Sequence, residues 1–199
     1  MYRLFYNYPI SKDVLFVLMD PSASVTKTKR AGEVVALYNE DRLVGYNIFD
    51  VSKTVKLNAH GIIFYPDPRL IDAINAILSR NGFGPLLYLD RSGFEVLKIL
   101  SIEEHPLDEK ASIVALRGKG EETFWTVSKA KNLLPSLRVV AATDGAILRD
   151  GTIFHKRIEK NLPIDVLLMS PKMLGLGEEE DVAFVVEEQN VALGHDFFE

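Results

Sequence analysis

Hydrophobic residues in the first 65 positions gather in short runs that have the length of β-strands. Residues 14–19 are apolar without interruption, and a run of this length favours a buried strand. Two further runs, residues 33–38 and 43–49, flank the polar segment 39–42, which is the pattern of a β-hairpin. The remaining strand candidates of this region are residues 1–7 and 62–65.

An amphipathic helix is predicted directly after these strands. Asp67 suits its N-cap and Pro68 its first position, while Asn81-Gly82 supplies a stop. Apolar residues recur at helical spacing between these ends: Leu70, Ile71, Ile74, Ile77 and Leu78. One helix that follows several strands indicates an α+β N-terminal domain, in which the helix covers one face of a sheet.

Two clusters of turn-forming residues, 81–85 and 90–93, separate this region from the rest of the chain. Such clusters interrupt regular structure. We therefore expect one domain over residues 1–90 and a second over residues 91–199. The apolar run 86–89 between the clusters is a further strand candidate of the first sheet.

The second half returns to short strands with turn residues between most of them. This pattern is typical of a small all-β barrel or sandwich, and about five core strands suit an OB-fold barrel with additional C-terminal strands. The strand candidates are residues 94–103, 112–117, 123–128, 137–143, 152–158 and 182–186.

Composition narrows the class of protein. The chain has no cysteine, which excludes disulfides and thiolate zinc sites and fits a reducing cytoplasm. It has no apolar stretch of membrane-spanning length and no signal-peptide pattern, so we expect a cytoplasmic protein without a membrane partner. The net charge is −5, yet residues 129–160 carry seven basic and three acidic residues. A local basic face on an acidic protein is the hypothesis, and a solvated surface is the alternative.

No constellation in the sequence points to catalysis or to a bound cofactor. His105 lies near acidic residues, but the other histidines lack metal-ligand spacing to it. Gly175-Leu176-Gly177 is followed by acids that would repel a phosphate, so it predicts a turn. Ser128 and Ser170 have no evident His/Asp partners. We expect no catalytic residue, no metal and no cofactor.

A series of motifs in the second half carries a family resemblance. The series runs through His105-Pro106, residues 127–132, residues 145–151 and Met169-Ser170. It resembles the EMAP-II-type tRNA-binding domain over about residues 94–199, and this resemblance implies an OB-fold and tRNA as partner. Some contact positions depart from the family pattern. Lys129 and Lys131 replace a glycine and a proline, and Asp165 replaces a small residue where a carboxylate would repel phosphate.

The first half extends the resemblance to nearly the whole chain. Residues 5–7, 32–35, 45–49 and 77–82 resemble the domain that precedes the tRNA-binding domain in the YtpR-like tRNA-binding-domain proteins of low-GC Gram-positive bacteria. The resemblance supplies no role for this N-terminal domain.

We therefore predict a non-catalytic protein that binds tRNA or another structured RNA through a basic face of the barrel. Trp125 and Phe154 are candidates for base stacking, although aromatic residues at strand spacing are more often core. Lys156 and Arg157 should point to opposite faces of their strand. The expected RNA-binding residues are Lys129, Lys131, Asn132, Arg149, Lys156, Lys160 and Ser170.

An alternative comes from another class of protein. A degenerate OB-fold without RNA affinity could serve as a protein-interaction or homodimerisation module, with Ile164 and residues 167–169 as its apolar edge. The two hypotheses differ in whether the seven basic residues of 129–160 converge on one exposed face.

Overall fold

A computed structural model describes residues 2–64, 66–88, 91–187 and 190–199. The chain divides into two compact units, Met1–Asp90 and Arg91–Glu199, called here the N-terminal and C-terminal units. Most of the regular structure in both units is β-strand. Tyr65 and Leu89, which end two of the predicted strands, lie outside the described residues, as does Asp90 of the second turn cluster.

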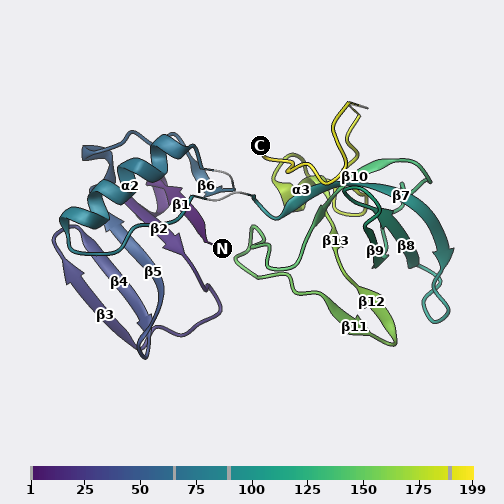
Figure 1. The fold of residues 1–199 in the computed structure, drawn as a ribbon, viewed down its shortest axis with the longest axis horizontal. Helices are drawn as coiled ribbons and strands as arrows, with labels where there is room; N and C mark the ends of the chain where they lie inside the picture. The colour runs from purple at the N-terminus through teal and green to yellow at the C-terminus, as the bar shows by residue number, and fades with distance from the viewer. Residues whose placement is uncertain (1, 65, 89–90, 188–189) are drawn as a thin grey trace. The chain divides into compact units, whose positions relative to one another are not determined.

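The N-terminal unit contains one six-stranded antiparallel sheet (Figure 1). Its order is β3-β4-β5-β2-β1-β6. The hairpin of β4 and β5 is the one predicted from the polar segment 39–42. The strands are β1 (Arg3–Asn7), β2 (Val14–Leu18), β3 (Lys27–Ala31), β4 (Val34–Asn39), β5 (Arg42–Phe49) and β6 (His60–Ile63). Two short elements complete it, α1 (Tyr8–Ser11) and the 3-10 turn η1 (Val51–Lys53).

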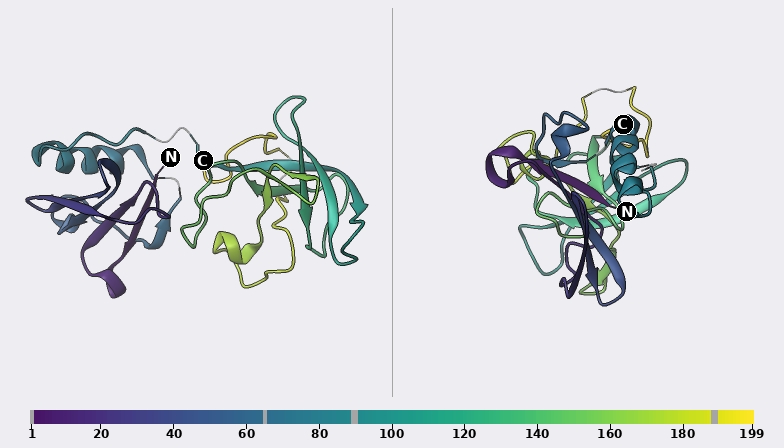
Figure 2. Two further views of the ribbon diagram at one scale, coloured as in Figure 1. Left: turned by 90° about the horizontal axis from the view of Figure 1, so that it is seen from below. Right: turned by 90° about the vertical axis from the view of Figure 1, so that its left-hand side faces the viewer.

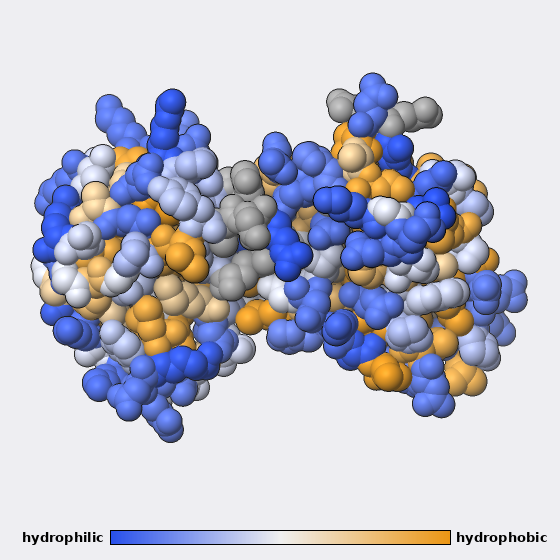
Figure 3. Space-filling model, viewed as in Figure 1, coloured by the Kyte–Doolittle hydropathy of each residue, from blue (hydrophilic) through white to orange (hydrophobic). Residues whose placement is uncertain are grey.

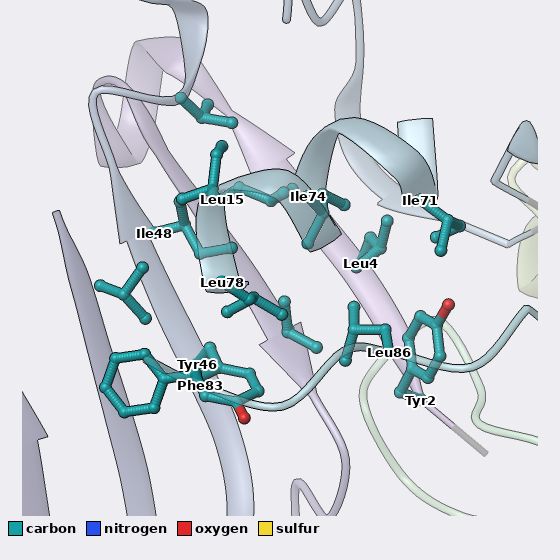
Figure 4. Close-up of a cluster of buried hydrophobic side chains, with 14 of the residues drawn as sticks. Tyr2, Leu4, Leu15, Tyr46, Ile48, Ile71, Ile74, Leu78, Phe83 and Leu86 are labelled. Carbon is teal, nitrogen blue, oxygen red and sulfur yellow. The ribbon is translucent and has the colours of Figure 1, made fainter. Parts of the chain in front are cut away.

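Helix α2 (Pro68–Arg80) covers one face of this sheet. The Asp67 carboxylate accepts a hydrogen bond from the Arg69 N–H at 2.7 Å, which satisfies one of the free donors at the helix start. Ile71, Ile74 and Leu78 pack against strand residues such as Leu4, Leu15 and Ile48, all of them buried (Figure 4). The unit is nevertheless mainly β-sheet and not clearly α+β. The predicted helix that covers one face of the sheet is present.

The C-terminal unit is built on a five-stranded antiparallel sheet of order β13-β10-β7-β8-β9 (Figures 1 and 2). A separate hairpin, β11–β12, and the short helix α3 (Pro171–Leu174) accompany it. The strands are β7 (Phe94–Glu104), β8 (Ser112–Arg117), β9 (Thr123–Ser128), β10 (Arg138–Ala142), β11 (Arg157–Glu159), β12 (Leu162–Ile164) and β13 (Leu167–Leu168).

The sheet of the C-terminal unit closes almost completely into a barrel at Asp165. The Asp165 N–H donates to the Trp125 carbonyl at 2.8 Å, and the Asp165 carboxylate accepts from the Trp125 N–H at 2.8 Å. The Thr126 hydroxyl donates to the Val166 carbonyl at 2.7 Å. These bonds join β9 to the segment between β12 and β13. Leu97, Ile99, Val114, Leu116 and Val139 are buried inside.

Two strands predicted for this half are replaced by other structure. Residues 152–158 form only an isolated bridge, Ile147–Ile153, and the first part of β11. Between them, the Lys156 N–H donates to the Asp144 carboxylate at 3.0 Å and not to a neighbouring strand. Residues 182–186 are no regular strand, although Val185 bridges Val139 beside β10.

Hydrophilic side chains cover most of the surface in the view of Figure 3, and hydrophobic ones appear as separate patches. No helix within the described ranges is both long and apolar enough to cross a membrane. The apolar residues 86–88 form no strand; Leu86 is buried, whereas Leu87 and Tyr88 are exposed.

Candidate nucleic-acid interface

A basic hollow lies between β9 and the β11–β12 hairpin of the C-terminal unit. Its volume is about 260 Å³. Three cationic side chains line it, Lys129 after β9 and Arg157 and Lys160 on the hairpin, and two carboxylates, those of Asp108 and Glu159, offset part of their charge. The hollow brings together basic residues about 30 positions apart in sequence.

The hairpin presents its cations because of its turn. Lys160 and Asn161 both have positive φ, 50° and 65°, as the central residues of a two-residue type I′ turn require. Lys160 is therefore exposed at the tip. Along β11, Arg157 and Glu159 line the hollow while Ile158, 77% exposed, alternates to the other side. The Arg157 guanidinium also lies 6.0 Å from the centre of the buried Phe154 ring.

Lys129 has a counter-ion within the hollow. Its Nζ lies 2.8 Å from the Asp108 carboxylate, and its side chain is 67% exposed. The hydrogen bond from Lys129, followed by the one from the Lys110 N–H, holds the pKa of Asp108 below its usual range. The loop that carries Asp108 is fixed by His105, whose Nδ1 accepts the Leu107 N–H at 3.1 Å. His105 thus has a structural contact in this loop.

An acidic hollow lies on the other side of Lys129. It has a volume of about 560 Å³ and is lined by Glu180 and Asp181, with Lys129 as its only lining cation in the described part of the chain. Lys131 forms an ion pair with Asp181, and this pair lowers the pKa of Asp181 and raises the pKa of Lys131. Each of the two lysines that depart from the family pattern therefore has an aspartate partner, but only Lys129 lines the basic hollow.

Two of the expected RNA-binding residues use their polar atoms within the protein. The Asn132 side chain donates to the Ala183 carbonyl at 2.9 Å and accepts from the Ala183 N–H at 2.7 Å. Ser170 is 3% exposed, and its hydroxyl accepts the Met173 N–H at 3.2 Å as the N-cap of α3. Both residues hold the C-terminal segment against the barrel.

The basic hollow is lined by three of the seven basic residues of 129–160. Arg149 lies against the turn at Gly175, where an added side-chain carbon would collide with its guanidinium. Lys156 is exposed but does not line the basic hollow. Arg138 donates to the Val191 carbonyl at 2.7 Å. Of the expected set, Lys129 and Lys160 share the hollow, and Arg157 joins them where Lys156 was expected.

The aromatic candidates separate into two classes. Phe154 is 5% exposed and belongs to the interior. Trp125 is half-buried on β9, and because side chains alternate along a strand it shares a face with Val127, which lines both the basic and the acidic hollow. Asp165, expected to repel phosphate, instead places its carboxylate on the Trp125 N–H.

The apolar edge required by the interaction-module alternative is not exposed. Ile164, Leu168 and Met169 are 5%, 8% and 1% exposed, and Leu167 is half-buried.

Gly175 ends α3 with φ 74°, so the glycine segment forms a turn, as predicted. The described residues contain no group of three or more His, Asp or Glu side chains that could hold a metal ion.

Comparison with known proteins gives two findings. The family model for a domain of unknown function, DUF4479, matches residues 21–90. The chain is also 30% identical over 176 residues to "Putative tRNA-binding protein YtpR" of Bacillus subtilis, an alignment that covers 86% of this chain and 87% of that protein. The second match spans parts of both units.

Proposed function

This chain belongs to the family of the Bacillus subtilis YtpR protein, and on that premise we propose that it is a non-catalytic protein that binds RNA through its C-terminal unit. The relative is named for tRNA binding, so tRNA or a similarly structured RNA is the expected ligand.

The connectivity of the barrel supports the proposal. We number β7, β8, β9, β10 and β13 as strands one to five. Strand one then has strands two and three on one side and strands four and five on the other. The hydrogen bonds at Asp165 bring strand five toward strand three. This is the arrangement of an OB-fold, a five-stranded Greek-key barrel that binds oligonucleotides on one face. We infer that the unit is an OB-fold of the EMAP-II type.

The basic hollow is the part of this barrel that suits RNA best. The observation that carries this choice is the convergence of Lys129, Arg157 and Lys160 on one hollow, next to the face of β9 that bears Trp125. Phosphate groups would take the exposed cations, and an unstacked base could stack on the half-buried indole. Backbone charge supplies much of the affinity in such complexes.

The expected residues then divide into two groups. Lys129 and Lys160 contact phosphate, with Arg157 as a third cation, and Lys131 contributes less because it does not line the basic hollow. Asn132 and Ser170 stabilise the unit and affect RNA only through its structure. Arg149 and Lys156 lie outside the contact. The homodimer alternative is less favoured, because Ile164, Leu168 and Met169 of its proposed surface are buried.

Filter binding of bulk tRNA at two salt concentrations tests the proposal. The intact protein should bind at low salt and release tRNA as salt rises, because counterions compete for the phosphates. Absence of binding at low salt would contradict RNA as the ligand. Binding that does not weaken with salt would contradict the cationic hollow as its site.

A further inference from the structure

The sheet of the N-terminal unit has a second face, opposite α2, that carries both apolar and polar side chains. Residues paired across neighbouring antiparallel strands point to the same face. The pairing places one row across all six strands on the side away from Leu4, Leu15 and Ile48. This row consists of Ile62, Phe5, Phe16, Asn47, Val35 and Arg30.

Aromatic side chains are prominent on this second face. The Phe5 and Phe16 rings lie 6.0 Å apart and are both half-buried. Phe49, two residues along β5 from Asn47, points to the same side and is also half-buried. An antiparallel sheet with one face toward water usually carries polar residues there. A face of half-buried phenylalanines, with α2 on the other side, indicates a binding surface.

A second cationic hollow adjoins these aromatics at the end of β5. It has a volume of about 390 Å³ and is lined by Arg30, Lys53 and Arg80, with Glu33, Asp50 and Phe49. Arg80 pairs with Glu33, and Lys53 lies 2.7 Å from Asp50. Arg30 extends its guanidinium over the Phe49 ring at 5.5 Å and donates to the Gly32 carbonyl at 3.3 Å. One aromatic ring therefore belongs to both the second face and the hollow.

We propose that this aromatic face, with Phe5, Phe16, Phe49 and Arg30 as its defining residues, binds single-stranded RNA. Aromatic rings on an open sheet stack unpaired bases regardless of sequence, and adjacent cations take the phosphates. The inference rests on the proposed function, since it gives the same protein a second RNA contact. It assigns a role to a domain for which the family model provides none.

A second copy of the chain fits this face less well than RNA does. Asn47 lies in the middle of the row across the sheet, and burying its amide without partners in a dry interface is costly. A symmetric dimer would also remove Arg30 and Lys53 from water. The edges of a nucleobase offer donors and acceptors to Asn47, and phosphate offers charge to Arg30.

The test is a titration of the full-length ¹⁵N-labelled chain with octauridylate, followed by amide chemical shifts. Amides of β2, β4 and β5 should shift together. Phe49→Leu keeps an apolar side chain but removes the stacking ring, and should weaken this binding roughly tenfold. Arg30→Gln should reduce the salt slope by about 0.7. Arg69→Gln, which removes a cation on α2, is the matched control and should change neither quantity.

Each contrary outcome is distinguishable. Shifts confined to amides of the C-terminal unit would overturn this inference and leave the proposed function standing. Two results together would assign the face to a second copy. The amide shifts of the aromatic face would depend on protein concentration without RNA, and sedimentation would show a dimer that Phe49→Leu abolishes. If Phe49→Leu lowers the melting temperature substantially, the surface substitution Arg30→Gln decides alone. No shift in either unit, with no tRNA retained on filters, would overturn both proposals.

Discussion

The two hollows beside Lys129 lie a few residues apart yet differ in the sign of their charge. On the hairpin side, Arg157 and Lys160 join Lys129. On the side of α3, Glu180 and Asp181 line the hollow, and their ion-pair partners are Lys172 and Lys131. The basic stretch of residues 129–160 is thus divided between two environments. Charge along a sequence indicates how many cations exist, but the fold decides which of them a phosphate can reach.

The largest expected effect comes from reversing two cations of the basic hollow. Lys129→Glu combined with Lys160→Glu should reduce tRNA affinity roughly 100-fold at low salt and lower the salt slope by about 1.4, as for two phosphate contacts on a single-stranded segment. Filter binding measures both. Lys131→Glu, which replaces the partner of Asp181 outside the basic hollow, is the comparison and should reduce affinity far less. Equal losses for the two sides would remove the distinction between the hollows.

A smaller effect should separate two adjacent residues. Arg157→Glu should weaken tRNA binding roughly tenfold, because Arg157 lines the basic hollow, whereas Lys156→Glu should change it by less than about twofold through long-range charge. The two variants have the same net charge, so any difference reports position. The same filter assay with matched melting temperatures checks this, and a stronger effect of Lys156→Glu would move the interface to the other side of β11.

Removing a carboxylate should have the opposite sign. Asp108→Asn releases Lys129 from its counter-ion in the basic hollow, and should raise tRNA affinity roughly two- to fivefold at low salt. Asp181→Asn releases Lys131, which does not line the basic hollow, so its gain should be smaller. Isothermal titration of both variants at one salt concentration compares them. A loss of affinity in Asp108→Asn would show that the Asp108–Lys129 pair arranges the hollow and does not compete with phosphate.

The smallest expected effect concerns pH and stability. The pKa values of Asp108 and Asp181 are both lowered by their lysine partners. Such groups stabilise the folded state above the unfolded pKa of about 3.9, and this contribution is lost as pH falls through the lower folded pKa. The melting temperature of wild type should slightly exceed that of the Asp108→Asn, Asp181→Asn variant at neutral pH. The difference should disappear in strong acid, and a difference that grows on acidification would contradict the ion pairs.

The features that sequence alone predicts are those with local physical causes. Periodicity and capping place α2 from Asp67 onward, and alternation of turn residues and apolar runs places β8 and β9 at their observed bounds. The sequence pattern does not predict strand β3, because Lys27–Arg30 are polar residues at a sheet edge, where no face is buried.

The composition of the site depends on contacts between distant positions, and this is where sequence reasoning is weakest. Asn132, expected to contact RNA, hydrogen-bonds Ala183, and Asp165, expected to repel phosphate, hydrogen-bonds Trp125; both stabilise the barrel. A continuous strand over residues 152–158 favours Lys156 over Arg157 as the residue that faces RNA. The structure has no such strand, and the Lys156 N–H binds the Asp144 carboxylate instead. Only the three-dimensional path of the chain shows that Arg157, and not Lys156, lines the basic hollow.

Trp125 offers the most direct measurement of the central claim, because it is the only tryptophan of the chain and shares a face of β9 with the wall of the basic hollow. Its fluorescence should be followed during a titration with bulk tRNA at two salt concentrations. RNA bound in the basic hollow predicts a saturable change in emission, with a midpoint that agrees with filter binding and moves to higher tRNA concentration as salt rises. Retention of tRNA on filters with unchanged Trp125 emission would contradict the basic hollow as the binding site.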